Sequence, residues 1–186
     1  MTKAVFLDRD GVINENRPDH VKSWAEFRFL PGVLDGIARL SEAGFRIFVI
    51  SNQAIVNRGV VSRDSVDTIN QRMIEEIRRR GGNVDAVAYC PHRPEEHCDC
   101  RKPQPGLLLA LARLHGLDLK EAIVIGDAMS DVDAAHAAGC RAILVKTGRG
   151  SEQLAIAMAS GRNGFAVAPD FKGATELLLG EAVVAA

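Results

Sequence analysis

Residues 4–11 read Ala4-Val5-Phe6-Leu7-Asp8-Arg9-Asp10-Gly11, an uninterrupted apolar run that ends in two carboxylates. Apolar residues without polar alternation are typical of a strand that is buried on both faces, as in a parallel sheet. Gly11 lets the backbone bend directly after the strand, so Asp8 and Asp10 can project to the same side. The stretch therefore predicts a buried strand with a pair of carboxylates at its end.

Further apolar runs follow at intervals along the chain. Buried parallel strands are predicted for residues 46–50, 84–89, 122–125 and 141–145, and an extra strand for residues 165–167. Helical patterns separate these runs: they cover residues 31–43, 62–80, 105–114 and 131–138, and two weaker ones flank residues 165–167. The alternation of strand and helix predicts an α/β fold with a doubly wound, mostly parallel sheet in a single domain of residues 1–186.

The composition excludes several classes of protein. With 186 residues, 47% hydrophobic and 25% charged, the chain can bury a substantial core, so disordered and fibrous classes drop out. The formal net charge of −1 provides no global field for nucleic acid or for an acidic membrane surface. No signal-like apolar segment precedes Asp8, and no apolar run approaches membrane-spanning length. We expect a soluble, cytoplasmic monomer with a small-molecule partner.

Polar residues follow the predicted strands, at the edge of the sheet where ligands bind in folds of this kind. These residues are Asp8 to Gly11, Ser51-Asn52-Gln53, the segment Cys90 to Lys102, and Gly126-Asp127. Carboxylates as close as Asp8 and Asp10, joined by Asp127 from another strand, repel one another unless a cation intervenes. A hard divalent cation with oxygen ligands resolves that conflict, so the sequence predicts a Mg²⁺ site at Asp8, Asp10 and Asp127.

Taken singly, each aspartate could be a turn former or helix cap, and Lys102 could be a solvated surface lysine. As a set, the residues favour a phosphoryl-transfer site. A carboxylate nucleophile at Asp8 forms an acyl phosphate that water can split, and Asp10 serves as its acid/base partner. The Ser51 hydroxyl, the Asn52 backbone N–H and the Lys102 ammonium would hold the phosphate oxygens.

Four segments resemble the ordered motifs of the haloacid dehalogenase (HAD) superfamily of phosphatases: Asp8 to Asn14, Ser51-Asn52-Gln53, Arg101-Lys102-Pro103, and Gly126 to Asp131. The resemblance covers residues 4 to about 146 and implies a three-layer sandwich with an aspartyl-phosphate mechanism. It implies that Asp8 is the nucleophile and Asp10 the acid/base, that Ser51 and Lys102 bind phosphate, and that Asp127 binds the metal. The metal ligand of Asp10 is then its backbone carbonyl, and Asp131 is an outer residue that positions the metal site.

A cysteine and histidine cluster precedes Lys102. Cys90, His92, Cys98 and Cys100 give the pattern C-x-H-x5-C-x-C, which suits a tetrahedral Zn²⁺. Four protein ligands leave no open position, so the ion would be structural. The alternatives are that Cys90 merely ends a buried strand beside chance thiols, or that His97 replaces His92. The paired C-x-H and C-x-C arrangement favours His92.

Two zinc-loop families of the superfamily are similar to this chain. The five-residue gap between His92 and Cys98 resembles the histidinol-phosphate phosphatases. The segments 53–59 and 101–106 resemble the D-glycero-D-manno-heptose 1,7-bisphosphate 7-phosphatases. We favour the heptose bisphosphate, with Asn52, Gln53, Arg58 and Arg101 as substrate-binding residues, because Arg58 and Arg101 can bind a second anionic group.

Some features depart from the heptose pattern or leave other functions open. Ala54 stands where that family often has Ser, and Ala128 replaces a frequent Lys. Residues 14–30 are too few for a cap domain and are expected to form a flap, with Asn16, Arg17, Asp19 and Trp24 at the entrance. A non-catalytic zinc-stabilised module would not need both Asp8 and Asp10. A phosphotransferase or mutase could pass the same aspartyl phosphate to an alcohol.

Overall fold

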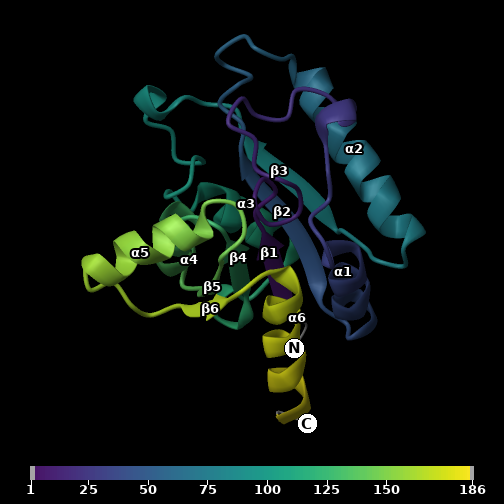
Figure 1. Cartoon of the computed structure of the whole chain (residues 1–186), viewed down its shortest axis with the longest axis vertical. Coiled ribbons are helices and arrows are strands. Elements are labelled where there is room, and N and C mark those ends of the chain that lie inside the picture. The colour runs from purple at the N-terminus through teal and green to yellow at the C-terminus, as the bar shows by residue number, and fades with distance from the viewer. Residues whose placement is uncertain (1–2, 185–186) are drawn as a thin grey trace.

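A parallel sheet forms the centre of the computed structural model, which describes residues 3–184 (Figure 1). Within that range it has six strands: β1 (Ala4–Leu7), β2 (Arg46–Asn52), β3 (Ala86–Cys90), β4 (Ile123–Gly126), β5 (Arg141–Val145) and β6 (Ala166–Ala168). Their order is β3-β2-β1-β4-β5-β6, and every neighbouring pair is parallel. From β1 the chain first adds β2 and β3 on one side, and then adds β4, β5 and β6 on the other side of β1. Such a switch point, here between β1 and β4, opens a crevice beyond the carboxyl ends of the strands.

Helices cover both faces of the sheet and make it the middle of three layers. The α-helices are α1 (Val33–Glu42), α2 (Arg63–Arg79), α3 (Gly106–His115), α4 (Met129–Ala138), α5 (Gly150–Ala159) and α6 (Phe171–Val184). In Figure 1, α1 and α2 lie on one side of the sheet and α4 and α5 on the other. The predicted doubly wound α/β sandwich is therefore confirmed, with a sheet that is wholly parallel.

Alternate strand residues build two separate hydrophobic cores. Val5 and Leu7 of β1 belong to the core beneath α1, α2 and α6, and Phe6 belongs to the core beneath α3, α4 and α5. The strands are apolar on both faces because both faces are covered. The continuous apolar runs in the sequence follow from this double burial.

The predicted boundaries are close to the observed ones, with two instructive shifts. Strand β3 begins two residues later than the run at 84–89, because the side chain of Asp85 accepts the backbone N–H of Ile47 at 2.9 Å. Helix α4 begins at Met129, two residues before the predicted start at Asp131. The carboxylate of Asp131 accepts the backbone N–H of Ala128 at 3.0 Å and so caps this earlier start.

The segment between β1 and α1 is a flap, as expected, and the described part of the chain contains no cap domain there. It holds the short 3-10 helix η1 (Trp24–Glu26), and an isolated bridge joins Asn14 to Phe29. The ring of Trp24 stacks on Phe27, with centroids 4.9 Å apart. No helix within residues 3–184 has both the length and the apolar character that crossing a membrane requires.

Candidate active site

A cavity of about 530 Å³ lies beyond the carboxyl ends of β1, β2 and β4. Its walls include Asp8, Asp10, Asn16, Arg17, Pro18, His20, Asn52, Arg101, Lys102, Ser130, Asp131 and Arg149. The position agrees with the switch point of the sheet, where chain segments far apart in sequence converge. The fold therefore brings most of the predicted site residues to one place.

Lys102 contributes a cation to the wall of this cavity, although its side chain is only 3% exposed. Its Nζ lies 2.6 Å from an oxygen of Asp8, 2.6 Å from an oxygen of Asp131 and 3.1 Å from the carbonyl oxygen of Ile50. Burial lowers the pKa of Lys102, but the charges of Asp131 and Asp8 outweigh burial and raise it above its ordinary value. The ammonium group is therefore fixed and charged.

Three buried carboxylates crowd around this lysine. Asp8, Asp127 and Asp131 each offer an oxygen atom, and these atoms lie within 4.8 Å of one another. Burial raises the pKa of Asp8 to about 8, with Lys102 opposing the shift and the other aspartates adding to it. Burial also raises the pKa of Asp127 to about 6. Such a group resists ionisation until a cation enters it.

Asp127 is placed so that a cation could complete its coordination. One of its oxygens accepts the backbone N–H of Arg149 at 2.8 Å, while the other is buried without a hydrogen-bond partner. A Cβ atom at Gly11 would lie 2.1 Å from this carboxylate, and one at Gly148 would lie 2.2 Å from it. Both glycines thus leave the space that the Asp127 carboxylate occupies. A group of carboxylate oxygens in which one buried oxygen lacks a hydrogen-bond partner suits a hard cation such as Mg²⁺.

The side chain of Asp10 points to a different set of partners. It accepts hydrogen bonds from Nη2 of Arg9 at 3.0 Å, from Nδ2 of Asn14 at 2.9 Å and from Nε2 of Gln53 at 2.7 Å. Burial raises the pKa of Asp10, but Arg9, Asn14 and Gln53 together outweigh burial and hold it below its ordinary value. These partners therefore favour the ionised form of Asp10, whose carboxylate lies outside the group formed by Asp8, Asp127 and Asp131.

Ser51 and Asn52, the last two residues of β2, make hydrogen bonds within the site. Ser51 is buried, and its Oγ accepts a hydrogen bond from Nε2 of Gln53 at 2.5 Å. The side chain of Asn52 makes two hydrogen bonds with the backbone of Lys102. Nδ2 donates to the carbonyl oxygen at 3.0 Å, and Oδ1 accepts the N–H at 3.1 Å. Asn52 therefore holds the backbone of the lysine in place.

Cys90, His92, Cys98 and Cys100 lie together next to the cavity. Their sulfur and Nδ1 atoms are separated by 3.2 to 3.5 Å in the pairs in contact. A tetrahedral Zn²⁺ with Zn–S bonds of about 2.3 Å separates its sulfur ligands by roughly 3.7 Å, so this group is close to the required size. His97 is exposed and lies outside the group of four metal-ligand atoms.

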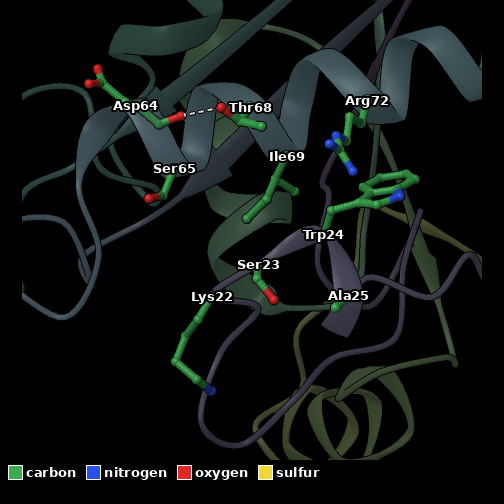
Figure 2. A pocket seen from close by; sticks show the side chains of 9 residues that line it. All are labelled: Lys22, Ser23, Trp24, Ala25, Asp64, Ser65, Thr68, Ile69 and Arg72. Atoms are coloured by element: carbon green, nitrogen blue, oxygen red, sulfur yellow. Dashed lines mark hydrogen bonds between the residues drawn. The ribbon is translucent and has the colours of Figure 1, made fainter.

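Several residues lie elsewhere than the sequence suggested. Arg58 is exposed and is not in the cavity wall, whereas Arg101 lines the cavity and donates to the carbonyl oxygen of His92 at 3.2 Å. Asp19 pairs with Lys22 at 2.5 Å, outside the cavity wall. Trp24 lines a separate hollow of about 440 Å³ between the flap and α2, where it faces Arg72 (Figure 2).

Other cavity residues escaped the sequence analysis. Arg149 follows β5 and lines the cavity. Its place after a strand is typical of a site residue in a parallel sheet, but the sequence after Val145 has too weak a pattern to single it out. His20, which no motif in the sequence singles out, lines the cavity from the flap and has positive φ (61°). Burial lowers the pKa of His20. Its backbone conformation carries no signal in the sequence.

The doubly wound sheet and the aspartates and lysine at its strand ends define the class of HAD-like hydrolases. A family model described as HAD-hydrolase-like matches residues 99–174. A phosphatase from Bordetella bronchiseptica is 39% identical, over 97% of this chain and 99% of its own length. One from Pseudomonas aeruginosa is 40% identical, over 81% of this chain and 84% of its own. The chain belongs to their family, the D-glycero-beta-D-manno-heptose-1,7-bisphosphate 7-phosphatases.

Solved structures agree with this assignment. The D,D-heptose 1,7-bisphosphate phosphatase from B. bronchiseptica, complexed with magnesium and phosphate, has a TM-score of 0.91 and 39% identity and covers 97% of this chain and 99% of its own. The enzyme from Burkholderia thailandensis has a TM-score of 0.74 and 32% identity and covers 96% of this chain and 99% of its own. The predicted superfamily and the preference for the heptose family over the histidinol-phosphate family are confirmed.

We predict that Mg²⁺ raises the Tm of the metal-free protein, and that this increase grows from about pH 5 to about pH 8. The folded-state pKa values of Asp127 and Asp8 are raised to about 6 and about 8, so the stability they contribute is lost as the pH rises through those values. A bound cation offsets that loss. Thermal unfolding with and without Mg²⁺ measures the effect.

The matched control is Asp127→Asn, whose amide oxygen can still accept the N–H of Arg149. This variant is expected to show a much smaller Mg²⁺-dependent increase in Tm than the wild type. An increase that shrinks as the pH rises, or that is equal in Asp127→Asn, contradicts the assignment of the carboxylates to a cation site.

Proposed function

We propose that this chain is a Mg²⁺-dependent phosphatase that removes the 7-phosphate of D-glycero-beta-D-manno-heptose 1,7-bisphosphate through an aspartyl-phosphate intermediate. The observation that carries the proposal is the contact between Lys102 and Asp8, because it places a fixed positive charge beside a carboxylate that faces the cavity. The names of the relatives support the substrate.

In the first step, an oxygen of Asp8 attacks phosphorus and the bond from phosphorus to the sugar oxygen breaks. Lys102 and the hydroxyl of Ser51 hold the phosphoryl oxygens while negative charge moves between attacking and leaving atoms. Mg²⁺ bound by Asp8, Asp127 and the backbone carbonyl of Asp10 would offset the negative charge of the phosphate as the nucleophile approaches. The product of this step is an acyl phosphate on Asp8.

Asp10 protonates the sugar oxygen as it leaves and then takes a proton from the water that splits the acyl phosphate. Because Arg9, Asn14 and Gln53 hold the pKa of Asp10 below its ordinary value, Asp10 acquires its proton in the substrate complex, where the negative phosphate raises its pKa. Hydrolysis releases phosphate and regenerates the carboxylate of Asp8.

Arg101 binds the second phosphate of the substrate from the wall of the cavity. Arg17 lies in the same wall and adds a further guanidinium group near the entrance. Arg58, assigned the same role from the sequence, is exposed and off that wall, which favours Arg101 for this function.

Zn²⁺ bound by Cys90, His92, Cys98 and Cys100 is proposed as a structural ion. The loop that carries these residues leads directly to Lys102, and Gln53 binds its start through a backbone hydrogen bond to Cys90 at 2.7 Å. Fixing the loop therefore fixes the lysine. Residues 1–186 as a single domain, the monomeric state and a cytoplasmic location stay predictions beside this proposal.

Asp8→Asn is expected to lower kcat by at least about a thousand-fold, because the amide cannot form the acyl phosphate. The matched control is Asp19→Asn, which changes an exposed aspartate outside the cavity wall and should keep activity close to the wild type. Steady-state phosphate release measures both. Substantial turnover by Asp8→Asn in a preparation free of wild-type enzyme would rule out the covalent mechanism.

The substrate is tested by comparing kcat/KM for the two anomers of the heptose bisphosphate with that for histidinol phosphate. We expect the beta bisphosphate to give the highest value, and Arg101→Ala to lose more activity on the bisphosphate than on a monophosphate. Arg58→Ala serves as the comparison and should lose little on either. A preference for histidinol phosphate would overturn the assigned substrate while leaving the phosphatase mechanism in place.

Purified protein is expected to contain one zinc ion per chain, measured by elemental analysis with the thiols reduced. His92→Ala should lose this zinc, and His97→Ala, which changes a neighbouring exposed imidazole, should retain it. Equal zinc in both variants, or none in the wild type, argues against the structural site. Because the loop positions Lys102, loss of zinc should also lower phosphatase activity.

A further inference from the structure

Arg9 is a fully buried arginine whose side chain spans two parts of the fold. It is 1% exposed and lies between the nucleophile and the acid/base in sequence, yet it does not line the cavity. Its Nη1 donates to Oδ1 of Asn70 at 3.1 Å, and its Nη2 donates to both oxygens of Asp10, at 3.0 and 3.2 Å. The guanidinium group thus connects helix α2 to the carboxylate of Asp10.

Asn70 stands out on the face of α2 that is turned to the core. Its buried neighbours on that helix are Val66, Ile69, Met73 and Ile77, all apolar, and Asn70 itself is 6% exposed. Placing an amide among apolar side chains costs free energy unless the amide is hydrogen-bonded. The contact with Arg9 supplies that bond, so the position of Asn70 is explained by its partner and not by packing.

The three groups that bind Asp10 act from different directions. Asn14 binds one oxygen and Gln53 binds the other, whereas Arg9 reaches both. Both contacts come from Nη2, so a shift of the guanidinium group changes the hydrogen bonds to both carboxylate oxygens at once. Since Arg9 has one end on Asn70 and the other on Asp10, removal of Asn70 leaves the guanidinium free to shift.

We infer that Asn70 and Arg9 are positioning residues that orient the carboxyl group of Asp10 toward the oxygen of the leaving group. The inference rests on the proposed role of Asp10 as the acid/base. Proton transfer requires the donor to lie within hydrogen-bond reach of the reacting oxygen, so a small change in orientation lowers its rate. Neither residue needs to touch the substrate.

Substrates with different leaving groups distinguish a positioning role from a merely structural one. A sugar alkoxide is a poor leaving group and needs the proton from Asp10, whereas p-nitrophenolate is a stable anion and leaves without one. Mispositioning of Asp10 should therefore lower kcat for a sugar phosphate much more than kcat for p-nitrophenyl phosphate. The KM values should change little, because the groups that bind phosphate are untouched.

Asn70→Leu removes the acceptor for Arg9, and we expect it to lower kcat for the sugar phosphate by roughly 10-fold more than kcat for p-nitrophenyl phosphate. Asn70→Asp keeps an acceptor and should restore a ratio close to that of the wild type. Ile77→Ala, which perturbs the buried face of the same helix away from Arg9, should leave the ratio unchanged even if it lowers Tm. Arg9→Lys, which cannot contact both partners in the same way, is the second variant if Asn70→Leu does not fold.

The inference is wrong if Asn70→Leu and Arg9→Lys fold and keep the wild-type ratio of kcat for the sugar phosphate to kcat for p-nitrophenyl phosphate. Equal losses on both substrates also overturn it, since they indicate a general structural effect. Asp10→Asn separates this outcome from failure of the proposed function. If Asp10→Asn itself shows no selective loss on the sugar phosphate, the role of Asp10 is wrong. If it does and the two positioning variants do not, only the inference fails.

Discussion

The contact of the Lys102 ammonium with Asp8 and Asp131 is the interaction on which the rest of the site depends. Both distances are 2.6 Å, and all three side chains are almost fully buried. Asp127 adds a third buried carboxylate within reach of the other two, and the pKa values of Asp8 and Asp127 are raised because the three carboxylates resist ionising together. A divalent cation would favour their ionised forms and offset the charge of an entering phosphate ester. The same charges suit the site to bind a metal ion and a phosphate ester together.

Two features of the fold position these side chains. One is the switch point between β1 and β4, which sets Asp8 beside the residues that follow β4. The other is the loop after β3, which brings Lys102 across the sheet from a strand that is not adjacent to β1. Asn52 binds the backbone of Lys102, and the proposed zinc site holds the loop that precedes it. The position of Lys102 therefore depends on the anchoring of its loop, whereas the position of Asp8, the proposed nucleophile, depends on the sheet.

Much of the fold could be predicted because its signals are local. Ser62, the first residue of the predicted helical pattern 62–80, caps α2 by accepting the backbone N–H of Ser65, and the apolar runs mark strands that are buried on both faces. The aspartates could be predicted because strand ends converge in a parallel sheet, and Lys102 because it belongs to the segment that follows β3. The link from Asn70 to Arg9 could not, since 61 residues separate them and an asparagine in a helix has no distinctive pattern. Arg58 shows the converse: its residue type suited anion binding, but it is not among the residues that line the cavity.

The central claim is that Asp8 carries the phosphoryl group during turnover. It is tested most directly by quenching the enzyme in acid during the first turnover and treating it with hydroxylamine, which converts an acyl phosphate into a hydroxamate. Peptide mapping by mass spectrometry then locates the modified residue. The account predicts a hydroxamate on Asp8 that appears only when substrate and Mg²⁺ are both present. A hydroxamate on Asp10 or Asp127, or none on any residue under conditions that trap the intermediate in a known aspartyl-phosphate enzyme, would contradict it.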